Sequence, residues 1–67
     1  MYKDDEAISA IKAHAEGVIK KHVFNVKVLM NKGVGVAEHP DIIETIQKEL
    51  DIIAENHDRL EMLDKYF

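Results

Sequence analysis

The chain has 67 residues, a net charge of −4 at pH 7 and no cysteine. This length allows one domain at most, and the lack of cysteine excludes disulfides and thiolate metal sites. The acidic balance disfavours binding to nucleic acid, which requires clustered Lys and Arg. Because so short a chain buries little core, we expect oligomerisation to supply the remaining stability.

The start of the chain and its hydropathy predict a cytoplasmic protein. The segment Met1 to Glu6 is acidic and lacks the basic start and apolar run of a signal peptide. No stretch approaches the roughly 20 apolar residues that span a bilayer. We therefore expect a soluble protein with no membrane partner.

The first predicted element is a helix over about residues 4–30. It is expected to begin at Asp4 or Asp5, where a carboxylate can accept hydrogen bonds from the free N–H groups of the first turn. Apolar residues then recur at helical spacing. Those assigned to helix packing are Ile8, Ile11, Val18, Val26 and Leu29.

Residues 23–36 also allow an alternative, a short β-hairpin flanked by helices. Val23 to Val28 is β-branched and nearly alternating, and Gly17 weakens the helix that precedes it. Val34 to Val36 would be the second strand. The helix is favoured because an isolated two-stranded hairpin is only marginally stable.

Residues 31–40 are predicted to form a loop, because they contain two glycines and Pro40. Binding residues often lie on such a turn at the tip of a rigid scaffold. The candidate partner residues of this loop are Val34, Val36 and His39. The alternative is that the two valines fold back and close the end of the helical pair.

The second predicted helix covers about residues 41–66, and Asp41 and Glu44 have the spacing of a capping box. Steps of three and four residues then mark one stripe, which we interpret as the a/d positions of a heptad. The stripe consists of Ile43, Ile46, Leu50, Ile53, His57, Leu60, Asp64 and Phe67. We expect it to lie against another helix.

Two helices of about 25 residues joined by a short loop predict an all-α antiparallel hairpin. Residues 1–40 carry a charge of +1 and residues 41–67 carry −5, which either favours packing of the two halves or reflects two solvated faces. Facing residues should have numbers that sum to about 71, which brings His22 near Glu49. Apolar residues outside the predicted contact, such as Phe24 and Met30, point to a further interface. We therefore expect two hairpins to associate into a four-helix bundle.

The four histidines are the only candidate chemistry in the sequence. His14 is expected near His57, with Glu55 and Asp58 close by, and imidazoles and carboxylates are ligands for zinc. No two histidines are four residues apart and no Glu-x-x-His motif is present. We therefore predict no metal site and no cofactor, and interpret His57 as a polar core residue that specifies helix register.

Catalysis is not indicated by any other motif. The chain has one serine, Ser9, and one threonine, Thr45. Gly33-Val34-Gly35 lacks the third glycine and the preceding strand of a dinucleotide-binding loop. We expect that the protein is not an enzyme.

Three segments of the chain carry a resemblance to known proteins. They are Gly33–Ile46, Leu60–Phe67 and Ala13–His22. They resemble small helical proteins, without assigned activity, of contractile-tailed marine cyanophages and marine viral metagenomes. The resemblance implies a phage origin, and therefore the cytoplasm of a host cell, and implies no mechanism.

Together these features predict a small non-enzymatic helical assembly or interaction protein that forms a homo-oligomer, with a dimer favoured. Two alternatives stay open. One is a binding module that captures a host protein or a small ligand at residues 32–39 or in a groove of the bundle. The other is a metal-binding bundle built from histidines and carboxylates.

Overall fold

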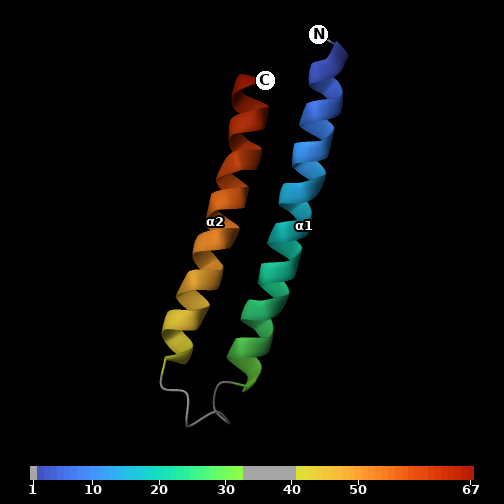
Figure 1. Ribbon diagram of the computed structural model, residues 1–67. Coiled ribbons are helices and arrows are strands. Elements are labelled where there is room, and N and C mark those ends of the chain that lie inside the picture. Colours follow the sequence, from blue (N-terminus) through green and yellow to red (C-terminus); the bar gives the residue numbers. More distant parts are fainter. Residues whose placement is uncertain (1, 33–40) are drawn as a thin grey trace.

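The chain is an all-α helical hairpin, as predicted (Figure 1). The computed structural model describes residues 2–32 and 41–67. Helix α1 spans Tyr2–Lys32 and helix α2 spans Ile42–Tyr66, and the two run side by side in opposite directions. We call the end of the rod where α1 begins and α2 finishes the free end, and the other the joined end.

Helix α1 is longer than the sequence pattern predicted. It begins at Tyr2 rather than near Asp4 and continues to Lys32, so residues 23–32 are helical. The alternative strand at Val23 to Val28 is therefore wrong, because the helical spacing of the apolar residues outweighs their β propensity. Residues 33–40, which hold the candidate loop residues Val34, Val36 and His39, lie outside the described residues.

Helix α2 begins directly after Asp41, close to the predicted position. The side chain of Asp41 makes no capping hydrogen bond, so the predicted capping box with Glu44 does not form. Thr45 instead binds the main chain of Asp41: its backbone N–H and its Oγ1 hydroxyl both donate to the Asp41 carbonyl oxygen, at 3.0 and 3.1 Å.

The two helices pack along a seam. In each helix, successive seam residues are alternately three and four positions apart. Every member is buried or half-buried. In α1 the seam consists of Ile8, Lys12, Ala15, Ile19, His22, Val26 and Leu29. In α2 it consists of Ile42, Ile46, Glu49, Ile53, Asn56, Leu60 and Leu63.

The register of the seam is the predicted one. The Nδ1 atom of His22 lies 2.6 Å from the Glu49 carboxylate, and the numbers of these two residues sum to 71. Because both helices repeat every seven residues, Ala15 lies one heptad away at the level of Asn56. The same register is consistent with Ile8 and Leu63 lining one hollow at the free end.

The seam differs from the predicted stripe of α2 at alternate positions. Glu49 and Asn56 occupy the places expected for Leu50 and His57, while Ile46, Ile53 and Leu60 belong to both sets. The predicted stripe therefore combines positions that belong to two stripes, and His57 is exposed in the hairpin. Two stripes lie side by side on α2, and α1 covers only one of them.

The rod leaves a large surface exposed. Its Cα radius of gyration is 15.7 Å, against about 11 Å for a compact chain of this length. Its accessible surface is 5379 Å², about a quarter more than the roughly 4,300 Å² expected for a folded monomer of this mass. The extents of 54 × 15 × 12 Å explain the excess, because two helices cannot enclose a core.

Gly17 offers a simple test of the α1 assignment. It lies in the middle of the helix, it is exposed, and a Cβ atom built on it would meet no atom within 4 Å. Gly17→Ala should raise the free energy of unfolding by about 0.5–1 kcal/mol, because alanine loses less backbone entropy in a helix. Urea unfolding followed by circular dichroism measures this. A loss of stability would contradict a continuous helix at this point.

Candidate interaction surface

Large apolar side chains remain exposed on the hairpin. Near the joined end, Met30 is 62% exposed and Ile43 is 67% exposed, and Leu50 one heptad later is 46% exposed. Phe24 is 65% exposed, but it lies on the outer side of α1 by its spacing from the seam. Exposed apolar residues that share one face usually mark an interface.

One ion pair shows which sides of the two helices adjoin. Lys12 Nζ lies 3.3 Å from Asp64 Oδ1, across one side of the seam. Residues seven or eleven positions apart on a helix lie on the same side, so other residues can be assigned to this side from these two. We call the set the lateral face: Lys12, Glu16, Val23 and Met30 of α1 with Ile43, Leu50, His57 and Asp64 of α2.

The polarity of the lateral face changes along the rod. Antiparallel spacing places Met30 at the level of Ile43, and Val23 at the level of Leu50. The half of the face nearer the joined end is therefore apolar. The other half carries Glu16 at the level of His57, followed by the Lys12–Asp64 ion pair.

The opposite side of the hairpin carries polar bonds between and along the helices. Asn25 Nδ2 donates to Glu49 Oε1 at 3.0 Å. Arg59 Nη1 donates to Asn56 Oδ1 at 3.1 Å and Arg59 Nη2 lies 3.8 Å from Glu55. This side is therefore less suited than the lateral face to a dry interface with a second protein.

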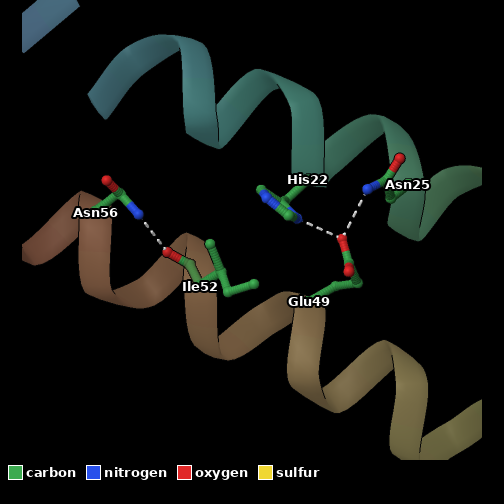
Figure 2. Close-up of polar contacts among 5 residues, drawn as sticks. All are labelled: His22, Asn25, Glu49, Ile52 and Asn56. Carbon is green, nitrogen blue, oxygen red and sulfur yellow. Dashed lines mark hydrogen bonds and ion pairs between the residues drawn. The ribbon is translucent and has the colours of Figure 1, made fainter. Parts of the chain in front are cut away.

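A polar cluster interrupts the apolar seam near its middle (Figure 2). His22 Nδ1 donates to Glu49 Oε1, since a carboxylate can only accept, and Asn25 donates to the same oxygen. The side chains of His22 and Glu49 are only 14% and 18% exposed. The hydrogen bond from His22, followed by that from Asn25, lowers the pKa of Glu49 below its usual range, and the nearby charge of Lys21 acts in the same direction.

Asn56 is the most buried polar residue in the described part of the chain, with 4% of its surface exposed. Its Nδ2 group donates to the Ile52 carbonyl oxygen at 2.9 Å, as Figure 2 shows. Its Oδ1 accepts the bond from Arg59. The facing position on α1 is Ala15, which is fully buried, and so small a side chain leaves room for an amide.

The histidines do not form a metal site within residues 2–32 and 41–67. No group of three or more histidine and acidic side chains gathers there at metal-binding distance. His14 and His57 are both exposed, and His22 is held by Glu49. His57 lies on the lateral face, where the hairpin itself gives it no core role.

An apolar hollow of about 300 Å³ lies at the free end of the rod. Its lining residues are Ala7, Ile8, Ile11, Leu63 and Phe67. This volume is at the lower limit of small-molecule pockets. The hollow is open to solvent, with Phe67 86% exposed and Ile11 40% exposed.

The predicted packing residues divide into two groups. Those within the hairpin are buried or half-buried: Ile8, Val18, Val26, Leu29, Ile46, Ile53 and Leu60. Those left exposed are Ile11, Ile43, Leu50, His57 and Phe67. Glu49 and Asn56 were not predicted, because the prediction was based on apolar residues, although steps of three and four also join them to Ile46, Ile53 and Leu60.

Neither helix in the described part of the chain combines the length and apolarity of a membrane span. The resemblance to cyanophage proteins stays a prediction. No family model, no curated protein and no solved structure matches the chain.

Proposed function

We propose that this protein is a small non-enzymatic assembly module that works as a homodimer, in which two hairpins pack through their lateral faces into a four-helix bundle. The observation that carries the proposal is the apolar half of the lateral face. Met30, Ile43 and Leu50 are 62%, 67% and 46% exposed there. Burial of such side chains stabilises association by about 25 cal/mol for each Å² removed from water.

The pattern on α2 supports a bundle rather than a lone hairpin. Ile42, Ile46 and Ile53 lie in the seam, and Ile43 and Leu50 form a second stripe beside it. A helix with one neighbour needs one apolar stripe, whereas a helix in a four-helix bundle contacts two neighbours and carries a wider one.

The surface of the hairpin supports the same reading. The accessible surface of 5379 Å² exceeds that of a compact monomer of this mass by roughly 1,000 Å². A stable interface buries about 600–1,000 Å² on each partner. Pairing of two hairpins would therefore remove about the amount of surface by which the rod exceeds a compact protein.

Sedimentation of two matched variants tests the proposal. Leu50→Glu places a charge on the lateral face, and Met62→Glu replaces another exposed apolar residue, 37% exposed, twelve positions further along α2. We expect the wild type and Met62→Glu to sediment as dimers at micromolar concentration and Leu50→Glu to sediment as a monomer. Circular dichroism should show that both variants remain helical.

Two results would contradict the proposal. One is a wild-type protein that stays monomeric at every accessible concentration. The other is a dimer that Leu50→Glu leaves intact, which would mean that association uses a different surface.

A further inference from the structure

The change of polarity along the lateral face carries an inference about how two copies meet. We infer that the two hairpins pack with their joined ends together, related by a two-fold axis along the rod, so that α1 of each lies beside α2 of the other. The inference rests on the proposed homodimer and goes beyond it, because it specifies the orientation of the partner.

In this orientation, positions at the same height along the two rods, which we call levels, match in polarity. A two-fold axis along the rod keeps each level opposite the same level of the second copy. Met30 then meets Ile43 of the partner subunit, and Val23 meets Leu50 of the partner subunit. Apolar residues of one lateral face are then buried against apolar residues of the other. The polar half of each lateral face lies against the polar half of the other.

The opposite arrangement mismatches the same levels. A two-fold axis across the rod would place the level of Met30 and Ile43 against that of Asp64. It would also place the level of Val23 and Leu50 against that of Glu16 and His57. Polar groups would then lose water without a matched partner, which costs free energy at each such contact.

Charge gives a second and independent argument. With joined ends together, each α1 lies beside the other copy's α2, so Lys12 comes near Asp64 of the partner subunit. Residues 1–40 carry +1 and residues 41–67 carry −5, so this arrangement separates the two acidic helices. With ends opposed, α2 would lie beside α2, and like charges would face each other at close range.

Distances between two spin labels in the dimer test the orientation. The chain has no cysteine, so a single Cys substitution gives one label on each copy. Gly17→Cys puts the label half-way along α1, where a side chain meets nothing within 4 Å. Glu6→Cys puts it near the free end, three turns away on the same exposed side of α1.

With joined ends together, the Glu6 pair and the Gly17 pair should show about the same distance, set by the width of the bundle. With ends opposed, the Glu6 pair would gain about 33 Å of axial separation, from eleven residues on each copy at 1.5 Å per residue, while the Gly17 pair would gain no axial separation. A longer distance at Glu6 would therefore overturn the orientation and leave the dimer standing.

Two other outcomes are also decisive. Long distances at both positions would show hairpins shifted along each other, which overturns the inference in the same way. The absence of any distance between copies, at concentrations where dimers are expected, would refute the proposed dimer itself and the orientation with it.

Discussion

Ile46→Ala should lower the free energy of unfolding by about 2–5 kcal/mol, because it removes a buried branched side chain and leaves a cavity in the seam. Ile46 is 9% exposed and lies between the two helices of one hairpin. The loss should appear at every protein concentration, since the contact is made within one chain. Urea unfolding at two concentrations, at least a hundredfold apart, measures it.

Ile43→Ala is the matched control, because the same residue type three positions earlier is 67% exposed. At low concentration, where the hairpin is monomeric, the change should move stability by about 0.5 kcal/mol or less. At high concentration it should reduce stability, because the proposed dimer buries Ile43. Equal losses at both positions under dilute conditions would contradict the assignment of the seam.

The His22–Glu49 pair gives the second large expected effect. Either His22→Leu or Glu49→Leu should destabilise the hairpin, because each leaves one polar side chain in the seam without its partner. The double variant should be more stable than either single variant, since leucine packs well at two facing seam positions. Urea unfolding of the four proteins at pH 7 measures the cycle. Single effects that simply add would mean that the two side chains act independently.

The contribution of the His22–Glu49 pair to stability should also depend on pH in the acid range. The lowered pKa of Glu49 means that the folded state holds this carboxylate in its charged form more strongly than the unfolded state does. The stability that it contributes is therefore present above the ordinary value of 4.5 and is lost as the pH falls through the lowered pKa. The double leucine variant should lack this component of acid destabilisation. If the stability of the double leucine variant fell with pH in the same way as that of the wild type, the acid destabilisation would come from other carboxylates.

The sequence was sufficient to predict two helices and their register. Apolar residues at steps of three and four over long stretches indicate a helix. The predicted break between the two helices then determines which residues can face each other in a hairpin. The contact of His22 with Glu49 confirms that register. The same spacings could not show which of two adjacent stripes on α2 faces α1, because large apolar residues occur in both.

The choice between the stripes depends on a polar contact between distant residues. Glu49 is accepted in the seam because His22 and Asn25 both donate to it, twenty-seven and twenty-four positions earlier in the chain. The pattern of apolar residues selects Leu50 in place of Glu49, because that pattern does not include contacts of polar residues with distant parts of the chain. The exposure of Leu50 and His57 depends on how the two helices pack, and the sequence pattern alone does not show that packing.

The polar pair has a consequence for sliding of one helix past the other. Most seam residues are aliphatic, and aliphatic side chains of similar size discriminate poorly between alignments offset by one heptad. A slide of seven residues would place Glu49 opposite Ala15 in one direction or Leu29 in the other, and would separate it from His22. A carboxylate in the seam thus lowers the stability of the hairpin but favours a single alignment of the two helices.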